Sequence, residues 1–378
     1  MPKYSFDEIA MNSTEKKKPT EGDKDTYIGL EHLDSGSLEV TRWGADVAPV
    51  GDKLVMKKGD VLFGRRRAYQ KKVAIAPFDG IFSAHGMVLR PIEAVVAREF
   101  FPFFISSDSF LDAAIQISVG SLSPTINWRD LCKLEFEIPT IEEQKELAPI
   151  LWGMNRLKVA YTRLLQQMDT LVQSQFVEMF KFIPEADYVP LQSVCRLITD
   201  GTHNPPKFVN QGIPFLLVSN ITGNKVTFDT EKYITEETYT ELMKRTPVEK
   251  GDILLSTVGS YGHPAIVESD QRFSFQRHIA HLKPNHLLID SHFLHSAILS
   301  TKVQQQIDVL VLGVAQKTLN LSAIKSIKIP LPTMAEQEDY NRFVQATDKS
   351  KFACEKQEKM LDVAIKTTIS ARNMIQSD

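Results

Sequence analysis

A cluster of cationic side chains around one aromatic residue is the sharpest chemical feature of the sequence. It follows an apolar run typical of a strand and consists of Arg65, Arg66, Arg67, Tyr69, Lys71 and Lys72. Guanidinium groups donate hydrogen bonds in a planar fork that fits phosphate oxygens or a guanine edge, and a neighbouring ring can position them. The run indicates DNA contact, with Lys57 and Lys58 before the strand as further phosphate contacts. A solvated surface loop is the alternative interpretation.

A second block of the sequence has the same order but a different loop. "EKGDILLSTVGSYGHPAIV" from Glu249 repeats the pattern of "KKGDVLFGRRRAYQKKVAI" from Lys57. The second loop has no arginine, but it keeps an aromatic residue, Tyr261, among small polar residues. Two copies of one scaffold with different loops indicate that each copy reads something different.

Other candidate DNA contacts are dispersed, and each taken singly is also compatible with an ordinary surface role. In the first half the candidate is Arg42. In the second half the candidates are Thr202, His203, Lys207, Ser219, Asn220, Ser256, Thr257, Ser260, Tyr261 and His263.

The correspondence between the halves keeps a constant spacing over a long stretch. An identical residue stands 193 positions after each of Gly120, Thr125, Asn127, Pro139, Thr140 and Gln144. A period of this length predicts duplicated domains rather than a solenoid.

A long amphipathic helix is predicted after each half. The first has an apolar seam in steps of four and three, formed by Ile150, Met154, Leu157, Tyr161, Leu164, Met168 and Leu171. Such a seam predicts a coiled coil, and the C-terminal run is the comparable antiparallel partner. Each helix opens with the spacing of a capping box, a threonine followed three residues later by glutamate. Two ordinary core helices of adjacent domains are the alternative.

The predicted fold class is α+β, with two pseudo-symmetric α/β domains separated by two long antiparallel coiled-coil helices. The predicted boundaries are 1–139 for the first domain, 140–182 for the central helix, 183–332 for the second domain and 333–378 for the C-terminal helix.

Composition limits the function classes. The chain has 378 residues and a formal net charge of −3, so DNA contact must come from local patches rather than a uniformly basic surface. Three widely spaced cysteines favour a reduced, cytoplasmic setting. The sequence has neither a secretory h-region nor an apolar run long enough to span a membrane.

The sequence lacks the usual signatures of catalysis. It contains no Gly-x-Gly, which argues against a Rossmann-type nucleotide or methyl-donor site. Asn204-Pro205-Pro206 is followed by Lys207, where an amino-methyltransferase signature needs an aromatic residue. The histidines of the second half lack the cysteine or carboxylate spacing of a metal site. We therefore expect no catalytic, cofactor-binding or metal-binding residue in this chain.

Taken together, these blocks resemble the DNA-specificity subunit of type I restriction-modification systems. The resemblance is carried by the two Gly-Asp blocks and by the "IPT" and "LPT" entries to the long helices, and it covers essentially the whole chain. It implies that each domain reads one half of a bipartite duplex DNA target and that the helices set the gap. It also implies two methyltransferase subunits and restriction/translocase subunits as partners, with S-adenosylmethionine, ATP and Mg bound on those partners. Two other functions are weighed against it, namely a self-sufficient DNA-modifying enzyme and a coiled-coil adaptor without DNA contact.

Overall fold

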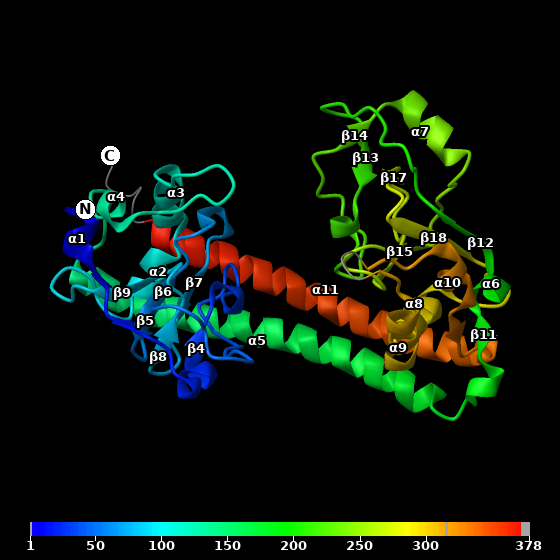
Figure 1. Ribbon diagram of the computed structural model, residues 1–378, viewed down its shortest axis with the longest axis horizontal. Coiled ribbons are helices and arrows are strands. Elements are labelled where there is room, and N and C mark those ends of the chain that lie inside the picture. The colour runs from blue at the N-terminus through cyan, green and yellow to red at the C-terminus, as the bar shows by residue number, and fades with distance from the viewer. Residues whose placement is uncertain (1, 314–316, 372–378) are drawn as a thin grey trace. The chain divides into compact units, whose positions relative to one another are not determined.

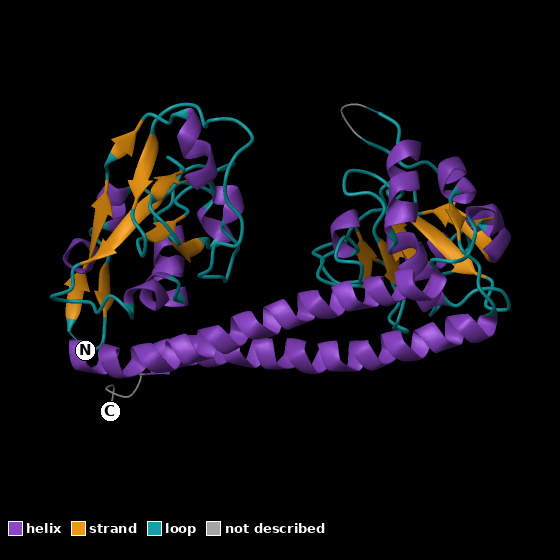
Figure 2. Ribbon diagram, turned by 90° about the horizontal axis from the view of Figure 1, so that it is seen from below, coloured by secondary structure: helices purple, strands orange, loops and turns teal. Residues whose placement is uncertain are grey.

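The chain folds into two compact units, each built from short strands and helices. The computed structural model describes residues 2–313 and 317–371. Unit 1 contains Met1–Thr162 and Glu355–Asp378, and unit 2 contains Arg163–Cys354. Each unit therefore holds one part of both long helices. The predicted α+β class, with two similar halves and two long helices, is confirmed (Figure 2).

Unit 1 has short strands followed by helices (Figure 1). Its elements are β1 (Lys3–Ser5), α1 (Phe6–Ile9), β2 (Ala10–Ser13), β3 (Lys16–Lys17), β4 (Tyr27–Ile28), β5 (Lys53–Met56), β6 (Val61–Phe63), β7 (Val73–Ile75), β8 (Gly80–Phe82), β9 (Met87–Pro91), α2 (Phe101–Ile105), α3 (Asp108–Gln116), α4 (Trp128–Leu131), β10 (Glu135–Glu137) and the first part of α5 (Ile141–Phe180).

The strands of unit 1 form two four-stranded sheets and one two-stranded sheet. The orders are β2-β9-β6-β7, β3-β5-β8-β4 and β1-β10. Only β4 and β8 pair in parallel among these described strands. Phenylalanines fill the core beside the first sheet, with the rings of Phe6 and Phe110 5.0 Å apart. Leu151 of α5 and Ile369 of α11 (Met334–Ala371) join this core, so the helices stabilise the unit through buried apolar area.

Unit 2 repeats this order. Its elements are the second part of α5, β11 (Val189–Pro190), α6 (Leu191–Val194), β12 (Cys195–Asp200), β13 (Ile213–Leu216), β14 (Tyr233–Ile234), α7 (Glu236–Met243), β15 (Ile253–Ser256), β16 (Pro264–Ile266), β17 (Ser274–Phe275), β18 (Ile279–Pro284), α8 (Ser291–Leu299), α9 (Thr301–Leu310), α10 (Leu321–Ser326), β19 (Lys328–Ile329) and the first part of α11.

The sheets of unit 2 correspond to those of unit 1. The order β12-β18-β15-β16 matches β2-β9-β6-β7, and β11-β19 matches β1-β10. The third sheet, β14-β13-β17, keeps the parallel pair in β13 and β17. The aromatic core of this unit joins Phe176 of α5, Phe293 of α8 and Tyr340 of α11. The predicted duplication is thus present in strand pairing as well as in sequence.

Both long helices begin with the predicted capping box. At the start of α5, the Thr140 N–H donates to the Glu143 carboxylate at 2.9 Å, and the Glu143 N–H donates back to the Thr140 hydroxyl at 3.4 Å. Thr333 and Glu336 make the same two bonds before α11, at 2.8 and 3.4 Å. These bonds satisfy first-turn amides that would otherwise lack partners. The predicted extension of the second helix to Asp378 lies outside the described residues.

The two helices run antiparallel within each unit, but the predicted apolar seam is only partly right: Met154, Tyr161 and Met168 are half-buried, whereas the other four positions are displaced by one residue. In unit 1, Lys158 of α5 pairs with Asp362 of α11 at 2.5 Å. In unit 2, Asp169 of α5 pairs with Lys351 of α11 at 2.5 Å. Each of these α5 residues follows a predicted seam position. One residue rotates a helix face by about 100°.

That rotation leaves the predicted leucines exposed. Ile150 and Leu157 in unit 1 are 56% and 54% exposed, and Leu171 in unit 2 is 50% exposed. The less exposed face of α5 is mixed: Leu165 and Met168 are half-buried on it, and the neighbouring Thr162 donates to the Glu358 carboxylate of α11.

One buried glutamine ties the start of each long helix to its own unit. The Gln144 side chain accepts from the Ala97 N–H at 2.7 Å and donates to the carbonyls of Pro139 and Val95 at 2.7 and 3.1 Å. In unit 2, the Gln337 side chain makes the equivalent three bonds. It accepts from the N–H of Asp290 and donates to the carbonyls of Pro332 and Leu288. Both glutamines are fully buried.

Replacing Gln144 with Leu should lower the free energy of unfolding of unit 1 by about 2–4 kcal/mol, because buried main-chain groups lose their partners. Urea denaturation measures the loss, and hydrogen exchange should locate it in unit 1. Gln173→Leu, at an exposed position of the same helix, is the control and should change stability by less than about 0.5 kcal/mol. Equal stability of the two variants would contradict the anchoring role.

Candidate nucleic-acid interface

The basic loop, residues 65–72 between β6 and β7, is anchored through its main chain. The Arg67 N–H donates to the Pro124 carbonyl at 2.8 Å, and the Ile126 N–H donates to the Arg65 carbonyl at 2.9 Å. Arg66 also forms a β-bridge with Thr125. The loop is therefore held against a segment far away in the sequence.

Two residues of the basic loop have left-handed main-chain conformations. Arg67 has φ 56° and Lys71 has φ 48°, on either side of the 3-10 turn Ala68–Gln70. This region of φ and ψ is uncommon for residues other than glycine and costs about 1 kcal/mol or more. The anchored turn maintains both conformations.

Most of the predicted cations of unit 1 are already engaged by the protein. The Arg42 guanidinium pairs with Asp34 at 2.6 Å, Lys57 pairs with Asp79 at 3.4 Å, and Lys72 donates to the Leu30 carbonyl at 2.7 Å. Within the basic loop, Arg65 donates to the Ala84 carbonyl at 3.3 Å, and an Arg66 nitrogen lies 3.3 Å from Nε2 of His85.

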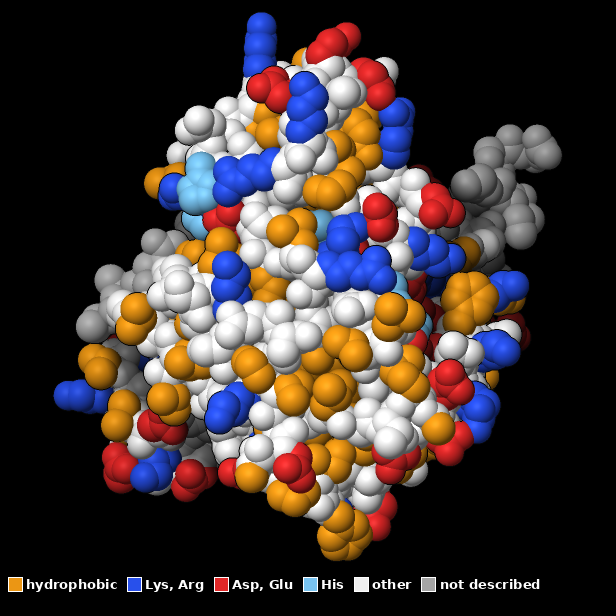
Figure 3. Space-filling view, turned by 90° about the vertical axis from the view of Figure 1, so that its right-hand side faces the viewer, with side chains coloured by type: hydrophobic (Ala, Val, Ile, Leu, Met, Phe, Trp, Pro, Cys, Tyr) orange, Lys and Arg blue, Asp and Glu red, His pale blue; other side chains and the backbone are white. Residues whose placement is uncertain are grey.

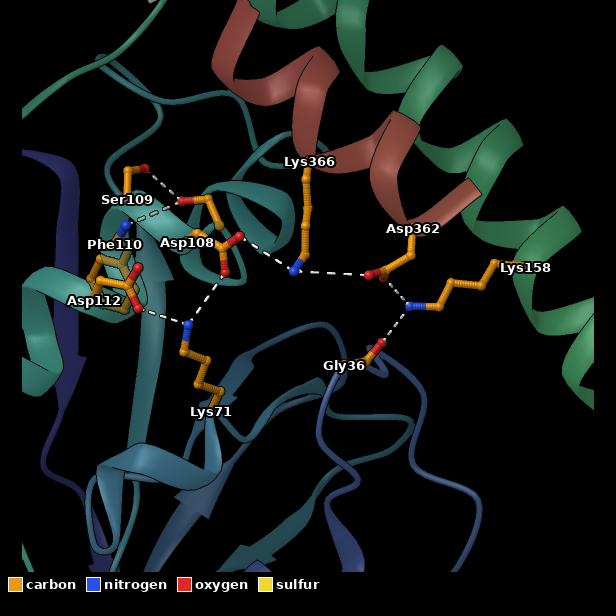
Figure 4. Close-up of polar contacts among 10 residues, drawn as sticks. Gly36, Lys71, Asp108, Ser109, Phe110, Asp112, Lys158, Asp362 and Lys366 are labelled. Atoms are coloured by element: carbon orange, nitrogen blue, oxygen red, sulfur yellow. Dashed lines mark hydrogen bonds and ion pairs between the residues drawn. The ribbon is translucent and has the colours of Figure 1, made fainter. Parts of the chain in front are cut away.

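Lys71 belongs to a network of alternating charges inside unit 1. Its Nζ lies 2.7 Å from the Asp112 carboxylate and 3.3 Å from that of Asp108. The hydrogen bond to Asp112 raises the Lys71 pKa, so Lys71 stays cationic. Lys366 of α11 continues the network, 3.3 Å from Asp108 and 3.8 Å from Asp362 (Figure 4).

The network continues from α11 to α5 around a small cavity. Asp362 pairs with Lys158 of α5, which also donates to the Gly36 carbonyl at 2.9 Å (Figure 4). These residues line a cavity of about 140 Å³. Lys71 was predicted as a DNA contact; its contacts in this structure hold the basic loop to α3, and Asp108 of α3 is in turn paired with Lys366 of α11.

In the part of the chain that the structure describes, three predicted residues of unit 1 have side chains whose polar groups make no hydrogen bond or ion pair with the protein. Arg67 and Lys58 are exposed and make no side-chain hydrogen bond or ion pair with a described residue. Tyr69, two residues after Arg67, is 56% exposed.

Unit 2 anchors its counterpart, the small-residue loop 256–263, with the same pattern. Val258 forms a β-bridge with Thr318, and the Leu319 N–H donates to the Thr257 carbonyl at 2.8 Å. The Gly259 N–H donates to the Lys317 carbonyl at 3.4 Å. Gly259, like Arg67, follows the bridge residue and has a positive φ, 73°.

Several predicted contacts in unit 2 are buried and hold the local structure instead. Ser256 and Thr257 are buried, and the Ser256 hydroxyl accepts from the His263 N–H at 2.9 Å. Asn220 is also buried, where it accepts from the Leu217 N–H and donates to the Asp229 carbonyl. Their geometry supports a positioning role.

The remaining predicted residues of unit 2 differ in exposure. Tyr261 is half-buried, and its hydroxyl donates to Asp308 at 2.9 Å. The side chain of His263 is half-buried beside Asn224. Exposed positions are occupied by Lys207, Ser219, Ser260 and His203, which pairs with Asp200.

In unit 2, the segment at Thr202 and the small-residue loop are both hydrogen-bonded to residues 276–278. Thr202 bridges Gln276, and the Arg277 N–H donates to the Thr202 carbonyl at 3.0 Å. The Thr257 N–H donates to the His278 carbonyl at 3.0 Å. The segment 276–278 thus links Thr202 to the small-residue loop.

Arg277 is an exposed candidate that the sequence analysis missed. It lies 193 positions after Ala84, whose carbonyl accepts a hydrogen bond from Arg65 of the basic loop. The repeat could therefore have pointed to Arg277.

One face of the molecule has mixed charge, and the described residues form no metal-binding cluster. On the face drawn in Figure 3, the Lys and Arg side chains are interspersed with Asp and Glu. Among the described residues, no group of three or more His, Cys, Asp or Glu side chains could hold a metal ion. Within the same residues, no helix is long and apolar enough to cross a membrane.

Comparisons with known proteins bear on the whole chain. The sequence profile of the type I restriction modification DNA specificity domain matches residues 7–162 and 185–361. The specificity subunit of the Escherichia coli type I restriction enzyme EcoBI is 31% identical over 150 residues, which are 40% of this chain and 31% of that protein. The MjaVIII specificity subunit of Methanocaldococcus jannaschii is 20% identical over 304 residues, 71% of this chain and 69% of that one.

A crystal structure of a type I restriction-modification S subunit from M. genitalium is also similar. It is 15% identical, with 97% of this chain and 94% of that chain covered and a TM-score of 0.48. The profile matches most of the chain in two segments, one in each half, which agrees with the duplicated strand order. The chain therefore belongs to the family of type I restriction-modification DNA specificity domains.

Proposed function

We propose that this chain is the sequence-specific DNA-recognition subunit of a type I restriction-modification complex, with each unit reading one half of a bipartite duplex target. Its family supports DNA recognition as the general role. The observation that carries the bipartite proposal is the pair of equivalent loops, 65–72 and 256–263. Their main chains are anchored alike, whereas their side chains differ, as two readers of different half-sites require.

The exposed groups divide into two kinds of contact. Lys58 and Lys207 carry single charges that suit phosphate oxygens. Arg66, Arg67 and Tyr69 in unit 1 carry hydrogen-bond forks or a ring that suit base edges. In unit 2, Ser260 and Arg277 are the corresponding candidates for contact with base edges.

The chemistry belongs to partner subunits in this proposal. Two methyltransferase subunits would bring S-adenosylmethionine, and restriction/translocase subunits would bring ATP and Mg. A role in reading chromosomal DNA places the complex in the cytoplasm.

The exposed apolar residues of α5 supply a docking surface for the methyltransferase subunits. They recur every seven residues, as Ile150 and Leu157 in unit 1 and Leu164 and Leu171 in unit 2. An apolar row on a helix gains free energy when a partner removes it from water. The neighbouring face of α5 is already occupied by α11 in both units.

Deleting this gene should remove one bipartite, gapped motif from the adenine-methylation map of the source genome, because the methyltransferase would lose its target reader. Single-molecule sequencing of the genome with and without the gene measures this. The wild-type gene returned on a plasmid is the control and should restore the motif.

An unchanged methylation map would contradict the proposed function. Methyl transfer by the purified chain with S-adenosylmethionine alone would instead support a self-sufficient enzyme. Failure of the complex to bind duplex DNA at low salt would favour an adaptor, since phosphate contacts give a steep salt dependence.

Replacing Leu157 with Glu should abolish co-purification of the methyltransferase subunit and leave the fold intact, because a charge would be desolvated in the docked surface. The free chain should lose less than about 0.5 kcal/mol of stability, since the residue is exposed. Gln166→Glu introduces the same charge at an exposed polar position on the other side of α5 and is the matched control. Undiminished co-purification of Leu157→Glu would place the docking surface elsewhere.

A further inference from the structure

Arg67 occupies a main-chain position whose positive φ favours glycine. In unit 1 the residue after the β-bridge Arg66–Thr125 is Arg67, and in unit 2 the residue after the bridge Val258–Thr318 is Gly259. Both N–H groups donate to carbonyls 193 positions apart, those of Pro124 and Lys317. Both residues have positive φ, 56° and 73°.

The same main-chain conformation therefore has different consequences in the two units. Glycine adopts a positive φ without steric cost, whereas the Cβ of an arginine disfavours it. Unit 1 nevertheless carries a large side chain at this position. A residue kept in a disfavoured conformation is a candidate for function.

The side chain of Arg67 does not compensate for this conformation within the protein. It is exposed, and its guanidinium makes no hydrogen bond or ion pair to any residue in 2–313 or 317–371. Lys71 shares the left-handed conformation, but it is held by Asp108 and Asp112. Arg65 and Arg66 are held at Ala84 and His85.

We propose that Arg67 is the specificity-determining residue of unit 1, and that its ligand is the O6 and N7 acceptor pair of a guanine in the major groove. This inference rests on the proposed function. A guanidinium reads that pair through two parallel hydrogen bonds, which demand a fixed direction of approach. The fork also fits a phosphate, but a phosphate contact carries no sequence information, and Arg67 stands at a position where the loops of the two units differ.

The test replaces the gene in the source genome with Arg67→Gly, Arg67→Lys or Lys58→Gly and maps adenine methylation. For Arg67→Gly, we expect the preference for guanine at one position of one half-motif to fall about tenfold or more, while the other half is unchanged. Arg67→Lys should not restore it, because an ammonium lacks the fork. Lys58→Gly removes a proposed phosphate contact, so it should lower methylation equally at all sites and leave the base preference unchanged.

The melting temperature of the purified chain separates this role from a structural one. Arg67→Gly should keep it or raise it by about 2–4 °C, because glycine relieves the conformation. A motif that Arg67→Gly leaves unchanged would overturn the assignment. Recovery by Arg67→Lys after an equal loss at all sites would identify a phosphate contact instead. Absence of any motif that depends on the wild-type gene would overturn the proposed function itself.

Discussion

The buried side-chain amides of Gln144 and Gln337 are the constraint on which the rest of each unit depends. An amide must both accept and donate when it is buried, and each of these does so with three main-chain groups. Those groups lie just after β10 and just before α2 in unit 1, and just after β19 and just before α8 in unit 2. One side chain therefore fixes where a long helix starts, its direction and its rotation. The capping box then satisfies the first amides of that helix.

With this frame in place, each unit can change its loop without changing its fold. The loops 65–72 and 256–263 use main-chain bonds for anchoring, and these bonds do not depend on side-chain type. Further support differs between the units. Unit 1 holds its loop with the charges of Lys71 and Asp112, whereas unit 2 uses the buried hydroxyl of Ser256. The few side chains left unengaged can then be selected for recognition alone.

Features carried by identical residues in the two halves could be predicted from the sequence. Features that depend on contacts between residues far apart in the sequence could not. Paired strings such as Pro-Thr-x-x-Glu-Gln gave the duplication and both helix starts. The engagement of Arg42 by Asp34 and of Lys71 by Asp108 depends on folding, so these residues looked as available as Arg67. Burial of Ser256 and Asn220 was hidden for the same reason. Four of the seven predicted seam positions are exposed because spacing shows that an apolar row exists, not which surface covers it.

The ion pairs between α5 and α11 have a physical consequence of their own. Ion pairs such as Lys158–Asp362 and Asp169–Lys351 contribute little net stability, but they penalise any shift of register that separates them. The apolar residues that would have strengthened the seam lie on another face of α5. A helix pair built this way fixes its own alignment with charges and keeps its hydrophobic area for a surface outside the chain. That division lets α5 hold the segment at Gly36 through Lys158 while its exposed apolar row stays available to the partner that we propose.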